Sequence, residues 1–165
     1  KPDWLQGISL RPLVDGEQAE VREEVFAEVN YHVCYEPQRA VRTRRWKYIR
    51  RLHERARPVL PDCDDSISKD FLIALGWRER EEAEERLYDL VCDPHETCNL
   101  AKEEAHAAVL AEMRKRLARW RRDTDDPLLS EPFFMPPETA QVADPDELSP
   151  KDAEALSARV FLGIE

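Results

Sequence analysis

Alternating apolar and polar positions, together with runs rich in apolar, aromatic and β-branched residues, predict four short strands before residue 92. Between residues 24 and 30, Val25, Ala27 and Val29 occupy every second position, which is the period of a strand with one buried face. Further strands are predicted over 39–43, 46–52 and 86–91. Because only Arg44 and Arg45 separate the second strand from the third, we expect a tight hairpin there.

One long amphipathic helix is predicted over about 102–122. Its apolar residues recur at steps of three and four positions and form one stripe, which consists of Val109, Leu110, Met113, Leu117 and Trp120. Arginine and lysine crowd its last two turns, where the helix dipole favours cations. We expect the stripe to pack on the sheet. The predicted fold class is therefore α+β: a small antiparallel sheet of about four strands, packed by one long amphipathic helix.

The remaining segments are predicted to be irregular, with two short helices. A helix over 69–75 would be capped by Ser68 and ended by Gly76. Residues 1–17, which we call the lead-in segment, carry much apolar surface for a short irregular stretch. This suggests that the segment docks against something larger. Beyond Asp123 the chain becomes proline-rich and acidic, which predicts an extended wrap or tail over 126–165. Within it, Ser149 could cap a terminal helix over 151–158.

Composition narrows the class of protein. The 165 residues are 42% hydrophobic and 36% charged, which is typical of a globular chain with a solvated surface. The net charge of −10 argues against nucleic-acid binding, and no apolar run reaches the roughly 20 residues that cross a bilayer. We therefore expect neither a nucleic-acid partner nor a membrane partner.

Candidate binding chemistry concentrates between residues 28 and 47. Glu28 and His32 could hydrogen-bond sugar hydroxyls, and Arg39 could hold a sulfate or carboxylate through its planar guanidinium. The run Thr43-Arg44-Arg45-Trp46-Lys47-Tyr48 is typical, though weakly, of heparin-binding patches. An alternative interpretation is that His32 is a structural histidine and that the basic run is a solvated strand face.

A second cluster allows two interpretations. Cys92, His95 and Cys98 have a spacing that could supply three ligands of a zinc site. The same stretch could equally be turn chemistry, in which Asp93 caps a helical turn and Glu96 completes a capping box. We expect no metal site there, and incidental thiols under a turn are favoured.

Several sequence blocks, in order, resemble the C-terminal part of the sulfatase family. They are PDWLQGISLRPLVDG (residues 2–16), RAVRTRRWKYI, ERLYDLVCDPHETCNLA and the amphipathic helix that follows. The resemblance implies a hydrolase of sulfate esters or sulfamates acting on sulfated sugars. It also implies that the formylglycine nucleophile and the calcium ion belong to an N-terminal catalytic domain, which would be the partner of this chain.

The resemblance also implies a division of the chain. Residues 1–17 would lead in from the catalytic domain, 18–125 would form the C-terminal subdomain, and 126–165 would be the tail. No catalytic residue, metal ligand or cofactor is then expected in this chain. Cys34-Tyr35-Glu36-Pro37-Gln38-Arg39 approaches the sulfatase motif C-x-P-x-R, but its proline and arginine each fall one place late. Glu28, His32 and Arg39 remain as candidates for substrate binding.

Two other functions compete with this interpretation. One is a binding module for sulfated glycans without catalysis, which the basic run would serve. The other is a small zinc protein built on Cys92, His95 and Cys98.

Overall fold

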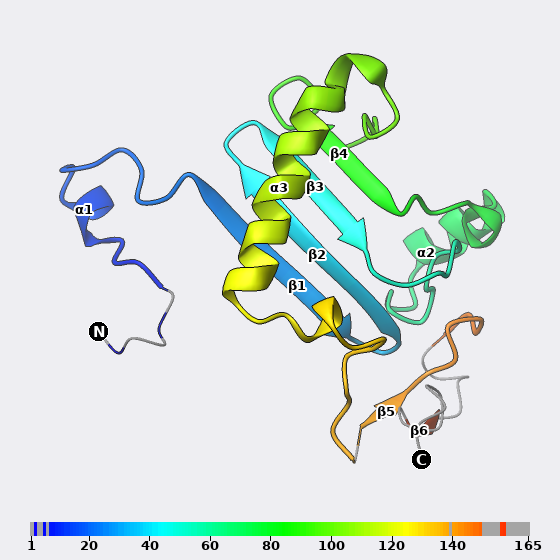
Figure 1. Ribbon diagram of the computed structural model, residues 1–165. Coiled ribbons are helices and arrows are strands. Elements are labelled where there is room, and N and C mark those ends of the chain that lie inside the picture. The colour runs from blue at the N-terminus through cyan, green and yellow to red at the C-terminus, as the bar shows by residue number, and fades with distance from the viewer. Residues whose placement is uncertain (1, 3–4, 6, 139, 150–155, 158–165) are drawn as a thin grey trace.

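A four-stranded antiparallel sheet lies at the centre of the chain, with its strands in the order β1-β2-β3-β4 (Figure 1). The computed structural model describes residues 2, 5, 7–138, 140–149 and 156–157. The strands are β1 (Glu24–Tyr31), β2 (Tyr35–Thr43), β3 (Trp46–Arg51) and β4 (Glu85–Asp89). Helix α3 (Ala107–Asp123) crosses one face of the sheet. The predicted α+β class, with about four strands and one long helix, is confirmed.

Hairpins join β1 to β2 and β2 to β3, whereas the long segment 52–84 joins β3 to β4. The predicted tight hairpin is present. Arg44 and Arg45 form the two-residue connection between β2 and β3, and Arg42 lies opposite Lys47. The Thr43 hydroxyl oxygen accepts a hydrogen bond from the Trp46 backbone N–H at 3.0 Å, which closes the turn. The local sequence therefore fixes the register between these two strands.

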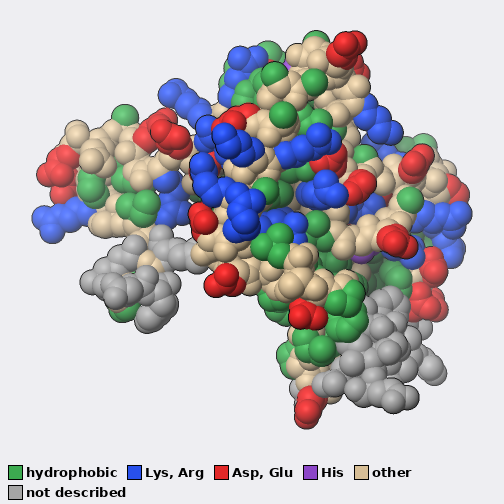
Figure 2. All heavy atoms as spheres, viewed as in Figure 1, with side chains coloured by type: hydrophobic (Ala, Val, Ile, Leu, Met, Phe, Trp, Pro, Cys, Tyr) green, Lys and Arg blue, Asp and Glu red, His purple; other side chains and the backbone are tan. Residues whose placement is uncertain are grey.

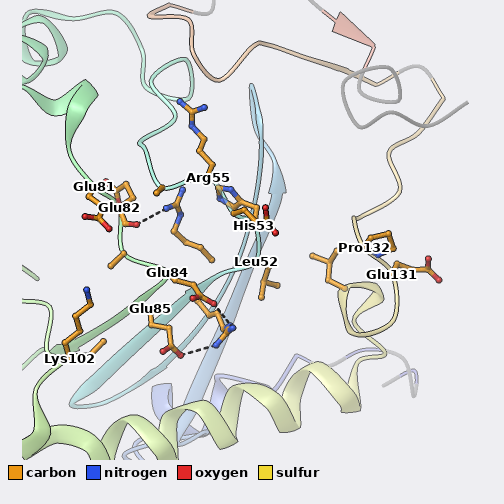
Figure 3. A pocket seen from close by; sticks show the side chains of 17 residues that line it. Leu52, His53, Arg55, Glu81, Glu82, Glu84, Glu85, Lys102, Glu131 and Pro132 are labelled. Carbon is orange, nitrogen blue, oxygen red and sulfur yellow. Dashed lines mark hydrogen bonds and ion pairs between the residues drawn. The ribbon is translucent and has the colours of Figure 1, made fainter.

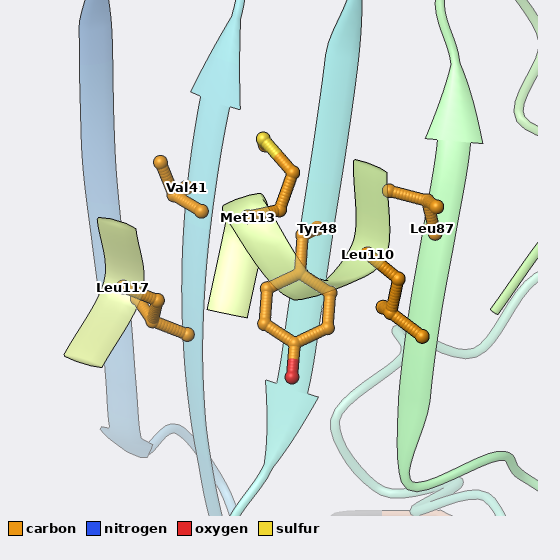
Figure 4. Close-up of a cluster of buried hydrophobic side chains, with 6 residues drawn as sticks. All are labelled: Val41, Tyr48, Leu87, Leu110, Met113 and Leu117. Carbon is orange, nitrogen blue, oxygen red and sulfur yellow. The ribbon is translucent and has the colours of Figure 1, made fainter. Parts of the chain in front are cut away.

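The core lies between the sheet and α3. Strands β2, β3 and β4 each contribute one fully buried side chain to this cluster, and α3 contributes three more along its stripe (Figure 4); they are Val41, Tyr48, Leu87, Leu110, Met113 and Leu117. Phe26 stacks on Trp120 at the edge of this cluster, with ring centroids 5.0 Å apart. The helical stripe predicted from the sequence is therefore the face that packs on the sheet.

Several element boundaries differ from the predicted ones. Strand β2 begins at Tyr35 and not at residue 39, because Pro37 lies within the strand and its carbonyl oxygen accepts a hydrogen bond from Leu52 N–H. Helix α3 begins at residue 107, because Glu104–His106 form a separate 3-10 turn. The short helix α2 spans Ile67–Ala74, and Ser66 caps it in place of Ser68.

The segment after β4 covers the outer edge of that strand. The Asn99 side chain accepts a hydrogen bond from Leu87 N–H at 3.0 Å and donates to the Glu85 carbonyl at 2.9 Å. Leu100 N–H donates to the Leu87 carbonyl, and Asp93 N–H donates to that of Asp89. This segment therefore has an architectural role.

The predicted capping box in that segment is wrong. The Asp93 carboxylate accepts hydrogen bonds from Cys98 N–H and the Thr97 hydroxyl, so it does organise the turn. Glu96, however, has a positive φ of 55° and pairs with Lys47 at 2.7 Å, so it does not reach back to Asp93. The turn is thus tied to β3 by an ion pair that the local pattern does not reveal.

The chain on either side of the sheet carries smaller elements. Helix α1 (Arg11–Val14) lies in the lead-in segment, and 3-10 turns occur at Trp77–Glu79 and Pro127–Leu129. In the tail, β5 (Gln141–Val142) pairs with β6 (Leu156–Ser157). The predicted helix over 151–158 falls mainly outside the described residues, and it is wrong at 156–157. The Ser149 hydroxyl donates to Asp65 Oδ2 and so joins the tail to the loop before α2.

Charge is unevenly spread over the surface. Figure 2 shows lysine and arginine side chains gathered over the outer face of α3. Most of these arginines are paired with acidic side chains, as Arg114 is with Glu85 and Arg119 is with Glu24. Across the described part of the chain, every helix is too short or too polar to cross a membrane.

Candidate functional site

The residues predicted to bind substrate lie at the end of the sheet where β1 ends and β2 begins. Glu28 and Arg39 are cross-strand partners, and Glu28 Oε2 lies 3.4 Å from Arg39 Nε. The Glu28 side chain is 53% exposed, so its carboxylate remains open to solvent. The structure therefore brings these two predicted residues together.

The Arg39 guanidinium is fully buried against Asp126. Its Nε donates to Asp126 Oδ2 and its Nη2 to Oδ1, each at 3.0 Å, which is the bidentate geometry of a strong charge-assisted pair. Its Nη1 donates to the carbonyl oxygens of Val29 and Gln38. In this arrangement Arg39 holds the segment after α3 against the sheet. A role for Arg39 in substrate binding remains a prediction.

Asp126 is a shared acceptor for two arginines. Arg121 Nε donates to Asp126 Oδ2 at 2.6 Å, and Leu128 N–H donates to Oδ1 at 3.1 Å. Burial alone would raise the pKa of Asp126, but the hydrogen bonds from Arg39 and Arg121 outweigh it and hold the pKa below the ordinary value. The carboxylate therefore remains ionised at neutral pH.

His32 lies in the turn between β1 and β2 and faces solvent. Its side chain is 66% exposed, and its Nδ1 lies 3.7 Å from Asp62 Oδ1. Asp62 also accepts hydrogen bonds from the N–H groups of Val33 and Cys34, so it fixes the turn that carries the histidine. In the described part of the chain no hydrogen bond or ion pair joins His32 to Glu28 or Arg39. His32 is thus an accessible group on an anchored turn.

A cavity of about 690 Å³ opens at the same end of the sheet, beside the end of β3 (Figure 3). The segment 52–56 lines one side, and Leu128, Glu131 and Pro132 line another. The segment 81–85 contributes a row of carboxylates, with Lys102 nearby. A cavity of this size accommodates a small organic ligand.

His53 lines this cavity, and its pKa lies well below the ordinary value for histidine. Burial, followed by the neighbouring cations Arg51 and Arg55, lowers its pKa to about 4. Its Nε2, like Nε of Arg51 and of Arg55, is buried without a hydrogen-bond partner among the described residues. At neutral pH His53 is therefore uncharged, and the cavity holds polar nitrogens behind a rim of carboxylates.

Sequence reasoning did not identify Asp62, Asp126 or His53. Asp62 contacts residues that lie 28 and 29 positions earlier, and Asp126 contacts Arg39 from 87 positions away. Such distant pairings leave no local pattern. The only available signal was the Asp125-Asp126-Pro127 turn that follows the predicted helix.

The cysteines differ in how far they are buried. Cys34 is fully buried, and burial together with Asp62 raises the pKa of its thiol to about 12. This thiol is therefore protonated and shielded, unlike a nucleophile. Cys92 and Cys98 are exposed free thiols. Within the described residues, no group of three or more His, Cys, Asp or Glu side chains is placed to hold a metal ion.

Two curated proteins resemble this chain in sequence. It is 31% identical over 145 residues to human N-sulphoglucosamine sulphohydrolase, covering 78% of this chain and 28% of that protein. It is 29% identical over 135 residues to the ulvan-active sulfatase of Formosa agariphila, covering 79% of this chain and 27% of that protein. The chain thus spans about a quarter of the length of these relatives. No family model matches it.

Solved structures share the fold. A 2-O GAG sulfatase superposes with a TM-score of 0.56 at 27% identity, over 83% of this chain and 24% of its own. A protein solved with its substrate D-glucosamine-2-N,6-O-disulfate superposes with a TM-score of 0.52 over 79% of this chain and 23% of its own; at 19% identity, this likeness concerns the fold alone. Taken together, the likenesses in sequence and in fold identify the chain as a sulfatase C-terminal region.

Proposed function

We propose that this chain is the C-terminal lobe of a sulfatase that acts on sulfated sugars. In this proposal the lobe completes the substrate pocket and has no activity alone. An N-terminal catalytic domain supplies the formylglycine nucleophile and the calcium ion. The observation that carries the proposal is the extent of the match: about four fifths of this chain aligns with sulfatases, yet it corresponds to about a quarter of their length.

The residues of this chain are proposed to contribute binding groups and not reacting groups. Glu28 and His32 are exposed at the end of the sheet, where they can hydrogen-bond sugar hydroxyls. Arg39 is proposed to position the Glu28 carboxylate for the substrate, because the Arg39 guanidinium lies 3.4 Å from it. Among the described residues, no group of three or more His, Cys, Asp or Glu side chains is placed to hold a metal ion.

Turnover by two forms of the protein tests the proposal. The 165-residue chain should not hydrolyse an aryl sulfate, whereas the protein expressed together with its upstream coding sequence should do so. Hydrolysis by the 165-residue chain would contradict the proposal. A longer protein that contains the formylglycine but does not hydrolyse the aryl sulfate would also contradict the proposal.

Variants of the longer protein test the binding role separately. Glu28→Gln and His32→Ala should raise KM for a sulfated saccharide and leave kcat for a small aryl sulfate unchanged, because both side chains are exposed and remote from the core. Lys115→Ala, on the outer face of α3, is the matched control. Equal KM values for all three variants would show that Glu28 and His32 do not bind the saccharide.

A sulfated-glycan binding module is the second candidate function. It is favoured by Arg44, whose side chain is 92% exposed at the tip of the β2–β3 hairpin. Retention of the 165-residue chain on heparin that weakens with salt and with Arg44→Ala would support it. Arg39→Ala is unsuitable for this purpose, because removing a buried pair to Asp126 tests folding and not binding.

A further inference from the structure

Helix α2 has its apolar side turned outward. Ile67 and Phe71 lie four positions apart in this helix, and Leu75, its C-cap residue, follows at the same spacing; they are 89%, 63% and 68% exposed. We call these three residues the α2 stripe. The buried residue of the same helix is a lysine, Lys69. An amphipathic helix normally buries its apolar side, so this orientation calls for a partner surface.

The outward orientation is held in place by polar contacts. The Lys69 side chain is 2% exposed, and its Nζ donates to the Cys63 carbonyl at 2.7 Å and contacts Asp65 Oδ1 at 3.3 Å. Ser66 caps the helix by accepting a hydrogen bond from Lys69 N–H. Rotating the stripe inward would expel the lysine from these partners. The stripe is therefore fixed as an outer surface.

Exposed carboxylates flank the α2 stripe. Asp64 precedes the helix and Asp70 lies within it, and both are exposed. In Figure 1, α2 lies beyond one end of the sheet and clear of α3. A matching partner would therefore present an apolar patch with basic groups at its rim.

We infer that the α2 stripe docks against the catalytic domain of the parent sulfatase. This inference rests on the proposed function. The lengths of the relatives support the catalytic domain as the partner of the stripe. The chain corresponds to only 27% and 28% of these two sulfatases, so the rest of such a protein needs a surface against which to pack. Further exposed apolar residues, including Leu10 and Val14, occur in the lead-in segment near α1. The surface that the chain presents to such a domain is thus apolar at more than one place.

Side-chain footprinting with a photoactivated diazirine tests the inference. It would compare the 165-residue chain with the protein that includes its upstream coding sequence. Modification of Ile67, Phe71 and Leu75 should fall several-fold in the longer protein. Val91, which is 67% exposed beside β4, serves as the reference that remains unchanged. A Phe71→Glu variant of the longer protein should regain labelling at Ile67 and Leu75, whereas Ser68→Glu, on an exposed polar position of the same helix, should not.

The outcomes separate this inference from the proposed function. Equal labelling in both proteins, with sulfatase activity in the longer one, would overturn the docking surface and leave the function intact. Protection that increases with the concentration of the 165-residue chain would assign the stripe to a second copy and would also overturn the inference. A longer protein without sulfatase activity would instead contradict the proposed function.

Discussion

Replacing Asp126 by asparagine should remove a large part of the stability of the fold. The Asp126 carboxylate accepts two hydrogen bonds from Arg39 and one from Arg121, and its side chain is 1% exposed. Asparagine would deprive the buried Arg39 guanidinium of its buried counter-charge, and the half-exposed Glu28 carboxylate, 3.4 Å from Arg39 Nε, would replace it only in part. Breaking a buried ion pair from one side costs about 3–5 kcal/mol. Since a domain is stable by only about 5–15 kcal/mol, the loss should be plain in any unfolding assay.

Urea unfolding of the 165-residue chain, followed by tryptophan fluorescence, measures this cost. Trp120 is a suitable reporter because it stacks on Phe26 beside the core. With a slope of about 1–3 kcal/mol/M, a cost of about 3–5 kcal/mol should lower the midpoint by roughly 1–5 M in urea. Asp125→Asn is the matched control, because Asp125 is exposed and its φ of 51° is one that asparagine accepts.

The pH dependence gives a second check on the same variant. The pKa of Asp126 is lowered in the folded protein, so its contribution is complete above the unfolded value of about 4 and is lost as the pH falls through the folded value. The difference in unfolding free energy between wild type and Asp126→Asn should therefore be constant from pH 6 to 8 and shrink below about pH 4. A cost under about 1 kcal/mol, equal to that of Asp125→Asn, would refute the reasoning.

Three further predictions follow from individual contacts. Asn99→Ala should cost about 1–3 kcal/mol in thermal unfolding, because the side chain bonds Leu87 N–H, Ala101 N–H and the Glu85 carbonyl; an unchanged melting temperature would count against this. His53 should titrate near pH 4 by NMR, and a titration midpoint near 6.5 would contradict the burial argument. The free energy of unfolding should decline as the pH falls from about 6.5 to 4, because the unfolded chain takes up the proton first. His53→Gln should flatten that decline. Iodoacetamide at pH 8 should modify Cys92 and Cys98 but spare Cys34 until the protein unfolds, as mass spectrometry can show.

Periodic patterns predicted where a strand and a helix lie, but only the helix pattern identified the buried face. The stripe through Met113 and Leu117 packs on the sheet as expected. The alternation around Val25, Ala27 and Val29 coincides with β1, yet Val25 and Ala27 are exposed and it is Phe26 that packs on the core. Boundaries were less predictable because neighbouring residues offer equivalent chemistry. Ser66 and Ser68 are both competent caps, and only the geometry of the preceding loop selects Ser66.

The contacts that define the candidate site were beyond local inference. Arg39 was recognised as a residue able to grip an anion, but its described partner is a carboxylate of the same chain, 87 positions later. The end of the tail shows the same limit. A serine followed by an acidic residue indicates a helix start, yet Leu156 pairs as a strand with Val142, a partner that the local pattern does not specify.

The hydrogen bonds made by residues 93–100 to β4 have a consequence for solubility. An outermost strand with free N–H and C=O groups is a template on which another chain can add a strand. Here the outward-facing groups of Glu85, Leu87 and Asp89 are already engaged by Asp93, Asn99 and Leu100. The segment therefore acts as a guard against edge-to-edge polymerisation, and lesions within it should promote aggregates before they promote simple unfolding.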